Sequence, residues 1–311
     1  MIAFLDRFHG QRFAIVCGVI SGLVFGIYWI PLRIMDAAGF PGIWAVLMFN
    51  AAAFVVVIPF VIRNNRELFP GRWKLHINTL MAGLCFVIYV AAFVYTEVIR
   101  VLVLYYLMPI WGFLFARIFN GDPITPTRWV SMALGLTGLI VICGIDQGIP
   151  MPRNAGDWMA LTAGILWGGV SLSMLNDETE PGNYTILFLF WAAAFSLLFA
   201  LLATSQGLVP APDWSATTGT LVWLIPLAIL LIAPAAYVTV YAPAHLNPGI
   251  VGLLWMTEIS VGAGTAALFA NEPFGPKEIG GIILITLAGI AEPIRMFMGG
   301  RTEGGPKQLS R

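Results

Sequence analysis

Asn120-Gly121-Asp122-Pro123-Ile124-Thr125-Pro126 and Asn271-Glu272-Pro273-Phe274-Gly275-Pro276 are two copies of one pattern, set 150 residues apart, and they decide the fold. In each copy an acidic residue precedes a proline, and a second proline follows three residues later. Both copies lead into apolar runs that contain glycine. A second match, Ser21-Gly22-Leu23-Val24-Phe25-Gly26 against Ala163-Gly164-Ile165-Leu166-Trp167-Gly168, recurs at a separation of 142 residues. The chain therefore contains an internal duplication.

The composition around these motifs is that of a membrane protein. Of the 311 residues, 59% are hydrophobic and 10% are charged, against about 25% charged in soluble domains. The mean hydropathy is +0.86. A helix needs about 20 mainly apolar residues to cross roughly 30 Å of hydrocarbon. Ten such runs are predicted, with cores at Phe13–Leu32, Ile43–Ile62, Leu75–Thr96, Ile99–Phe119, Trp129–Ile145, Trp158–Asn176, Tyr184–Thr204, Leu221–Tyr241, Ile250–Ala270 and Ile279–Phe297.

The duplication sets the expected topology. It divides the ten runs into one to five and six to ten, and a unit with an odd number of spans is followed by a copy of opposite orientation. The sequence thus predicts an all-α polytopic membrane protein with ten transmembrane helices in a 5+5 inverted repeat. The expected parts are a cytoplasmic N-terminus at 1–12, a first five-helix repeat at 13–145, a linker at 146–157, a second repeat at 158–297 and a flexible cytoplasmic tail at 298–311.

Positive charges predict the orientation, because Lys and Arg accumulate in cytoplasmic loops. With the N-terminus inside, all of the 16 Lys and Arg residues are cytoplasmic except Arg33, Arg100, Arg153 and Lys277. The acidic loop Asp177–Asn183 also falls inside, but acidic residues contribute little to this asymmetry. We expect a multi-pass protein of a cell inner (plasma) membrane with both termini cytoplasmic.

Charge balance and cysteine usage exclude several protein classes. With 16 basic and 16 acidic residues the net charge is zero, so nucleic acid is not an expected partner. Cys17, Cys85 and Cys143 lie in apolar runs without metal-ligand or disulfide spacing, and no metal or cofactor is expected. The sequence has no HExxH, GxSxG or P-loop pattern, which disfavours an enzyme. The expected partners are the lipid bilayer and a small-molecule substrate, with monomer and homodimer both open.

Four features carry a resemblance to a known family: the stretch Gly22–Trp29, Tyr106–Pro109 in the fourth span, Met256–Glu258 in the ninth, and the two acid-proline loops. Over residues 12–297 the chain resembles the drug/metabolite transporter superfamily, specifically its EamA type. The resemblance implies alternating access around a central cavity and, commonly, efflux of amino acids or other small metabolites.

Glu258 is the first candidate functional residue, because it lies near the middle of the ninth span. A charged carboxylate there costs at least about 2.5–3.5 kcal/mol on insertion scales unless it is paired or protonated. Desolvation favours the neutral acid, which makes Glu258 the candidate proton-coupling residue and a candidate for the substrate cavity. A carboxyl that only fixes helix packing is the alternative.

Pro109 marks a second candidate region in the fourth span. Proline lacks a backbone donor, and at this position it frees the carbonyl of Tyr105. Inside a membrane such breaks are tolerated where they face protein or a wet cavity. We therefore expect Pro109, Tyr105, Tyr106 and Trp111 to lie near the substrate cavity, with a kink that only shapes the bundle as the alternative.

The remaining candidates are two tryptophans and two polar residues. Trp29 and Trp167 lie deep in spans or beside the repeated glycine motifs, unlike tryptophans at the membrane interfaces. Asn50 is a polar cavity candidate, although an interhelical hydrogen bond explains it equally well. Arg33 ends the first span on the outer side, either as a cavity-mouth cation for an anionic cargo group or as a side chain that reaches toward the interface.

Together these features predict a secondary active transporter that exports small metabolites such as amino acids by alternating access, with proton coupling through Glu258 as the candidate mechanism. A drug or cation efflux transporter is the main alternative. A passive channel and a membrane-embedded enzyme are further alternatives.

Overall fold

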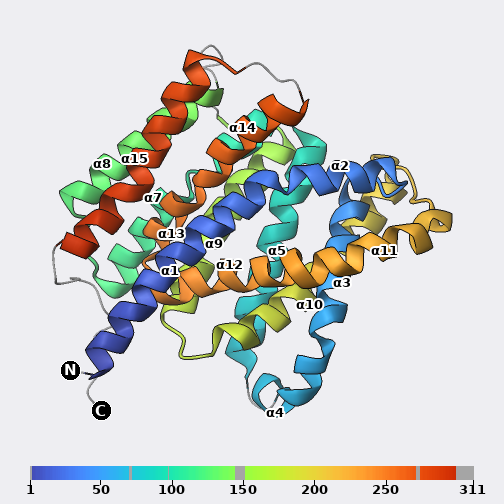
Figure 1. The fold of residues 1–311 in the computed structure, drawn as a ribbon, viewed down its shortest axis with the longest axis horizontal. Helices are drawn as coiled ribbons and strands as arrows, with labels where there is room; N and C mark the ends of the chain where they lie inside the picture. Colours follow the sequence, from blue (N-terminus) through green and yellow to red (C-terminus); the bar gives the residue numbers. More distant parts are fainter. Residues whose placement is uncertain (1, 70–71, 97, 144–150, 271–273, 299–311) are drawn as a thin grey trace.

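The computed structural model describes residues 2–69, 72–96, 98–143, 151–270 and 274–298, and these residues form helices joined by turns, without a strand (Figure 1). The expected tail beyond Met298 and residues 146–150 of the expected linker lie outside the described residues, as do Asn271, Glu272 and Pro273 of the second acid-proline loop. Helix α9 begins at Ala155, inside the expected linker.

Apolar helices dominate the described chain. In order they are α1 (Ile2–Ile27), α2 (Trp29–Ala37), α3 (Ile43–Arg63), α4 (Asn65–Leu68), α5 (Trp73–Tyr95), α6 (Val98–Tyr105), α7 (Met108–Phe115), α8 (Pro126–Cys143), α9 (Ala155–Leu175), α10 (Pro181–Ser205), α11 (Thr217–Leu227), α12 (Ala233–His245), α13 (Pro248–Trp255), α14 (Thr257–Ala270) and α15 (Pro276–Met298). A π-helical turn at Ala116–Asn120 continues α7, and another at Ala228–Ile232 joins α11 to α12.

Among the described residues, eight helical stretches are long and apolar enough to cross a membrane. They are Gly10–Ala37, Ile43–Arg63, Trp73–Phe93, Arg100–Asn120, Ala155–Leu175, Pro181–Ser205, Trp214–His245 and Pro248–Phe269. The all-helical, multi-span prediction is confirmed. The count of ten stays a prediction, because the expected fifth span is the shorter helix Pro126–Ile142 and the expected tenth, α15, is not among the eight.

Two of these stretches are broken at equivalent places. The fourth breaks between α6 and α7 around Tyr106, and the last breaks between α13 and α14 at Met256, 150 residues later. In the first break Pro109 occupies the opening turn of α7, and the amide of Ile110 donates to the Leu107 carbonyl at 3.0 Å. In the second break the Thr257 hydroxyl donates to the Leu254 carbonyl at 2.8 Å, so a side chain competes with the helical ladder.

Glycines let the broken helices approach their neighbours closely. A Cβ at Gly22 of α1 would lie 3.3 Å from the Glu258 amide, and one at Gly26 would lie 2.9 Å from the Glu258 carbonyl oxygen. A Cβ at Gly164 of α9 would lie 2.6 Å from the Tyr105 carbonyl oxygen. Small residues permit such contacts between membrane helices. The repeated glycine motif therefore makes the same kind of contact twice, α1 against α13–α14 and α9 against α6–α7.

The other helix contacts follow the same correspondence. Helix α5 packs on α9 and α12 packs on α1, while α3 packs on α10, α7 on α13 and α8 on α15. Figure 1 shows α8 and α15 side by side at one edge of the bundle. If spans one to five are exchanged with spans six to ten, each of these contacts maps onto itself or onto another member of the set.

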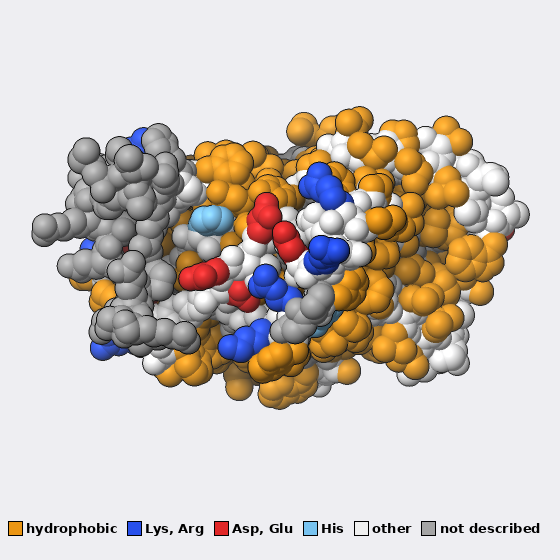
Figure 2. All heavy atoms as spheres, turned by 90° about the horizontal axis from the view of Figure 1, so that it is seen from below, with side chains coloured by type: hydrophobic (Ala, Val, Ile, Leu, Met, Phe, Trp, Pro, Cys, Tyr) orange, Lys and Arg blue, Asp and Glu red, His pale blue; other side chains and the backbone are white. Residues whose placement is uncertain are grey.

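Polar side chains join the helices at the end of the molecule that carries α4. Asn120 and Asn176 exchange side-chain hydrogen bonds of 3.1 and 2.9 Å, and Asn247 donates to Asp122 at 2.8 Å. Seen from this end, charged side chains gather in the middle of the face and hydrophobic side chains surround them (Figure 2). This arrangement is the one expected where a helix bundle leaves the hydrocarbon.

The contact at Gly164 yields a stability prediction. Gly164→Ala forces its Cβ against the Tyr105 backbone, which cannot rotate away, so we expect a destabilisation of about 1–3 kcal/mol, typical of an overpacked core. Melting in detergent, followed by size-exclusion of the heated sample, measures this. Gly264→Ala in α14 is the control, because a Cβ there meets nothing within 4 Å. Equal melting temperatures for the two variants would contradict the packing described here.

Candidate functional site

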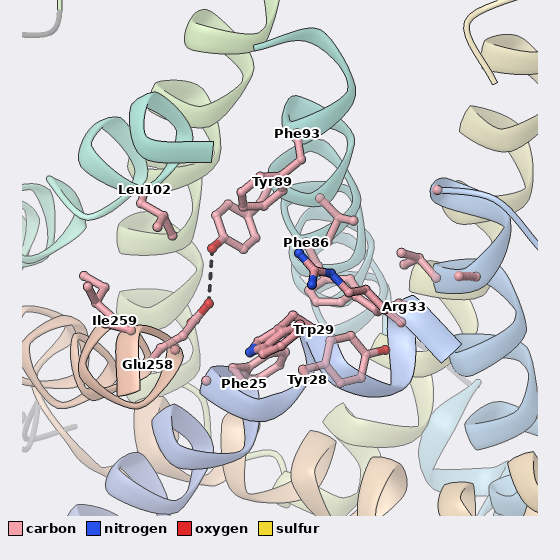
Figure 3. A pocket seen from close by; sticks show the side chains of 18 of the residues that line it. Phe25, Tyr28, Trp29, Arg33, Phe86, Tyr89, Phe93, Leu102, Glu258 and Ile259 are labelled. Atoms are coloured by element: carbon pink, nitrogen blue, oxygen red, sulfur yellow. Dashed lines mark hydrogen bonds between the residues drawn. The ribbon is translucent and has the colours of Figure 1, made fainter. Parts of the chain in front are cut away.

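A cavity of about 710 Å³ opens between α1, α2, α3, α5 and α14 (Figure 3). Six aromatic side chains line it: Phe25, Tyr28, Trp29, Phe86, Tyr89 and Phe93. Pockets for small molecules have volumes of about 300–1,000 Å³ and mainly apolar walls with a few placed polar groups. The cavity therefore has the size and lining of a site for a small organic molecule.

Glu258 forms the inner end of the cavity. It lies halfway along the 22-residue stretch Pro248–Phe269, in the first turn of α14, where the helix dipole stabilises a negative charge. The Tyr106 hydroxyl lies 2.5 Å from its Oε2 atom, and the Tyr89 hydroxyl donates to Oε1 at 3.2 Å. Figure 3 shows the Tyr89 bond spanning the cavity from α5 to α14. The carboxyl is thus held by two phenols while it still reaches the cavity.

The mouth of the cavity carries charged groups. Arg33 lies over the Trp29 ring, with its guanidinium carbon 4.7 Å from the ring centroid, and it is turned into the cavity (Figure 3). Asp36 and Glu278 line the same end. The Trp29 indole N–H donates to the Thr265 hydroxyl at 3.1 Å, which fixes the ring between α2 and α14. The cavity therefore has a guanidinium near its mouth and a carboxyl at its inner end.

Three residues singled out from the sequence line the cavity: Trp29, Arg33 and Glu258. Two others lie directly behind its wall. Tyr106 is fully buried and binds Glu258, and Tyr105 stacks on Tyr89 with ring centroids 4.0 Å apart. The expectation that the proline-linked break in the fourth span lies beside the cavity agrees with this placement.

Other sequence candidates lie away from the cavity. Asn50 is buried and donates to the Ser196 hydroxyl at 3.1 Å, which is the interhelical hydrogen bond named as the alternative. Pro109 packs on α13, where a Cβ at Gly252 would lie 2.9 Å from the proline ring. Trp111 lies beside Gly168, and its buried indole nitrogen has no hydrogen-bond partner among the described residues.

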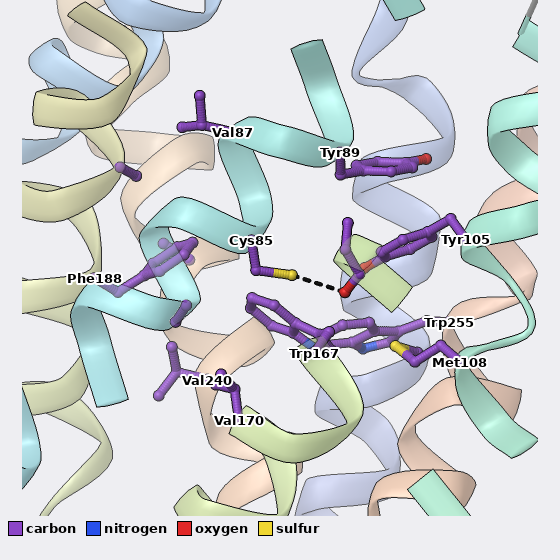
Figure 4. Close-up of a cluster of buried hydrophobic side chains, with 14 of the residues drawn as sticks. Cys85, Val87, Tyr89, Tyr105, Met108, Trp167, Val170, Phe188, Val240 and Trp255 are labelled. Atoms are coloured by element: carbon purple, nitrogen blue, oxygen red, sulfur yellow. Dashed lines mark hydrogen bonds between the residues drawn. The ribbon is translucent and has the colours of Figure 1, made fainter. Parts of the chain in front are cut away.

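Trp167 lies in a packed cluster rather than in the cavity (Figure 4). Its ring centroid lies 5.3 Å from that of Trp255 and 6.2 Å from that of Phe188. Cys85, beside this cluster, donates its thiol to the Ala163 carbonyl at 2.9 Å. Cys85 and Cys17 are buried, as expected of small core residues, whereas the Cys143 side chain is outside the described set.

The sequence analysis did not identify most of the aromatic residues that line the cavity. Phe86, Tyr89, Val90 and Phe93 follow one face of α5 at intervals of three and four residues. Phe25, Tyr28, Trp29 and Leu32 repeat that spacing on the first span. Two aromatic stripes at helical spacing were the available signal, but aromatic residues on apolar helices are also ordinary packing residues.

This arrangement supports binding and proton exchange rather than bond chemistry. Aromatic walls stack flat rings, a carboxyl takes a cation, a hydrogen-bond donor or a proton, and a guanidinium takes an anionic or acceptor group. Among the described residues, no group of three His, Cys, Asp or Glu side chains is placed to hold a metal ion.

Comparison with known proteins agrees with an all-helical transporter fold. Residues 12–144 match the family model described as the EamA-like transporter family. The match assigns residues 12–144 to the EamA-like transporter family. A riboflavin transporter of Rhizobium johnstonii is 28% identical over 233 residues, which cover 70% of each chain. A protein of known crystal structure shares the fold, with a TM-score of 0.71 and 15% identity over 94% of this chain and all of the other.

This EamA-like protein is accordingly a multi-pass membrane transporter whose substrate is a small molecule. The suspected resemblance is confirmed over its first half by the family match. The residues that hold the substrate are not assigned by these similarities. The cavity at Glu258 remains the candidate on geometric grounds.

Accessibility of the cavity gives a second prediction. In a variant without the native cysteines, Val90→Cys in the cavity wall is expected to react with a membrane-impermeant maleimide added to intact cells. Val87→Cys is the matched control, because the same residue type on the same helix is fully buried there. The cavity-wall thiol is expected to label clearly faster, because a fully buried thiol reacts only through local opening of the structure. Equal rates would show that the cavity is closed to water or faces the other way.

Proposed function

We propose that this EamA-like transporter is a secondary active exporter of ten spans, in which two five-helix units of opposite orientation move a flat aromatic metabolite by alternating access. Glu258 couples that movement to protons. The observation that carries the proposal is the cavity itself, which is lined by aromatic rings and ends at a carboxyl halfway along a membrane helix. A midplane site beside broken helices is typical of secondary transporters built from inverted repeats.

The inverted repeat is supported by three correspondences. The acid-proline loops recur at 150 residues, the helix breaks at Tyr106 and Met256 recur at the same separation, and the glycine contacts of Gly22 and Gly164 recur at 142. The exchange symmetry of the helix contacts adds a fourth. Under this arrangement α8 and α15 are the fifth and tenth spans.

Alternating access is supported by the different surroundings of equivalent residues. Phe25 and Tyr28 line the open cavity, whereas their equivalents 142 residues later, Trp167 and Val170, lie in the packed cluster of Figure 4. One copy of the motif therefore faces an open path and the other a closed one. Exchanging these two environments would open the cavity at the opposite end of the bundle.

The charge asymmetry supports an orientation with both termini in the cytoplasm, in a cell inner (plasma) membrane. The cavity mouth, at Asp36 and the first turn of α15, then faces outward. The Asn120–Asn176 and Asp122–Asn247 bonds close the cytoplasmic end. In this proposal the structure is the outward-open state, from which an exporter releases cargo and takes up a proton at Glu258.

A flat ring system is the cargo that the walls favour. Stacking between aromatic groups contributes about 0.5–1.5 kcal/mol per pair beyond area burial, and six aromatic residues line this cavity. The similarity to a protein named as a riboflavin transporter agrees with such a cargo. Aromatic amino acids are the second candidate, because a carboxylate near Arg33 and an ammonium near Glu258 would match the two charged ends of the cavity.

Cargo binding is tested with riboflavin as the probe. Riboflavin should raise the melting temperature of the purified protein, because a ligand that binds only the folded state stabilises it. Trp29→Ala should weaken binding roughly fivefold or more, the loss of about 1 kcal/mol of stacking. Trp158→Ala, at an exposed tryptophan of α9, should leave binding unchanged. If tryptophan shifts the melting temperature and riboflavin does not, the second cargo class replaces the first.

Proton coupling is tested separately in vesicles. A gradient of one pH unit is worth about 1.4 kcal/mol per proton, so one-for-one exchange should sustain a cargo ratio approaching about tenfold. Glu258→Gln keeps the shape of the side chain but cannot ionise, so the cargo ratio that this variant sustains across the vesicle membrane should stay near one. Exchange of labelled for unlabelled cargo is the control and should survive in this variant. A wild-type response of Glu258→Gln to the pH gradient would leave Glu258 with a packing role.

A further inference from the structure

Tyr106 connects the two helix breaks. It lies between α6 and α7, is fully buried, and points its hydroxyl at two acceptors of the opposite break. The Glu258 Oε2 atom lies 2.5 Å from the hydroxyl oxygen, and the Trp255 carbonyl lies 3.2 Å from it. In a continuous helix the Ile259 amide would donate to the Trp255 carbonyl, but here it donates to Met256 at 3.1 Å. The break therefore frees a carbonyl that the tyrosine reaches.

A phenol has one proton, so it cannot donate to both acceptors at once. When Glu258 is a carboxylate, the charge-assisted bond to the carboxylate is the stronger, and the Trp255 carbonyl loses its donor. When Glu258 is protonated on Oε2, its own O–H donates to the Tyr106 oxygen. The phenol proton is then free for the Trp255 carbonyl.

We infer that Tyr106 is the positioning residue that converts the protonation state of Glu258 into a change of the α13–α14 break. This inference rests on the proposed coupling role of Glu258. In the acid form, hydrogen bonds run from Glu258 through Tyr106 to the Trp255 carbonyl and connect the α13–α14 break to the α6–α7 break. In the carboxylate form the carbonyl is released, and an unsatisfied carbonyl in a membrane interior favours re-pairing with the Ile259 amide. That re-pairing straightens the helix.

The geometry assigns the sign of the effect. Both distances from the Tyr106 oxygen fall within hydrogen-bond range together, which the acid form satisfies in full. The outward-open arrangement is then the protonated one. Raising the pH should shift the population away from this state, and the cavity should become less accessible from its mouth.

Few other ionisable groups surround Glu258 in the described residues. Tyr89 comes from α5, and Tyr105 and Tyr106 come from the break between α6 and α7, while Arg33, Asp36 and Glu278 lie toward the cavity mouth. Tyr89 is the informative comparison. It donates to the same carboxyl at 3.2 Å, but it lies within α5 and belongs to neither break.

The test measures the labelling rate of Val90→Cys by a maleimide as a function of pH, in a variant without the native cysteines. Met151→Cys, at an exposed position on the same predicted side, corrects for the pH dependence of thiol reactivity. The corrected rate of the otherwise wild-type protein should fall by about fivefold or more as the pH rises, a typical size for coupling between two sites. Riboflavin is omitted, so the readout does not depend on the cargo.

Three variants separate the possible explanations. Glu258→Gln should label at the fast, acid-form rate at every pH, and Tyr106→Phe should lose the pH dependence although Glu258 still titrates. Tyr89→Phe should keep it. A pH response retained in Glu258→Gln overturns the coupling role of Glu258 and this inference with it. If the labelling rate of Glu258→Gln is independent of pH but that of Tyr106→Phe still changes with pH, only the relay through Tyr106 is overturned. A pH-independent labelling rate in Tyr89→Phe also overturns only this relay.

A measurement on the unmutated chain guards against loss of folding in Tyr106→Phe. Hydrogen exchange of the segment 255–260, corrected for the intrinsic effect of pH, should differ between the acid and the carboxylate form. The same segment in Glu258→Gln should show no such difference. Equal protection of this segment at both pH values in the wild type would overturn the relay.

Discussion

Backbone groups in hydrocarbon must find partners inside the protein, and this constraint governs the centre of the structure. Two helices are broken at equivalent depths, so each break frees backbone groups that lipid cannot satisfy. The breaks therefore face protein. The Tyr105 carbonyl lies against Gly164 and the Trp255 carbonyl accepts from Tyr106, contacts that glycines and one buried phenol make possible. The close packing of α9 on α6–α7 and of α1 on α13–α14 follows from the need to enclose these breaks.

The same broken backbone also favours a carboxyl group at this depth. Glu258 follows directly after a break, in the first turn of α14, where amides without helical acceptors and the helix dipole favour an anion. Desolvation favours the acid, and two phenols hydrogen-bond either form. No single large energetic contribution therefore excludes either the acid or the carboxylate form of Glu258. A group balanced in this way suits reversible proton binding better than a carboxylate locked by an arginine, such as Asp157, which Arg100 binds through both Nε and a terminal nitrogen.

Much of this arrangement could be predicted from the sequence, because its causes are local. The acid-proline loops and glycine motifs revealed a duplication, apolar length revealed the spans, and Pro109 marked a break. Glu258 was identified because charge is costly in hydrocarbon. The aromatic wall of α5 was not found, since every face of a membrane helix is apolar and periodicity does not say which face meets a cavity. The placement of Asn50 and Trp167 outside this cavity could not be predicted for a related reason: whether a polar or aromatic side chain meets cargo or a neighbouring helix depends on contacts distant in sequence.

The two units differ where the candidate chemistry lies. A shift of 150 residues relates Glu258 to Met108 and Tyr106 to Met256, so the carboxyl and its phenol come from opposite units and neither has a counterpart. The structure has two similar breaks and two similar glycine contacts, and in the proposed alternating-access cycle these give the bundle two nearly equivalent arrangements. An ionisable group in one break alone makes the energies of those arrangements depend differently on protonation. In the proposed function, inverted symmetry provides the two states, and the departure from that symmetry at Glu258 and Tyr106 makes their relative populations depend on protonation.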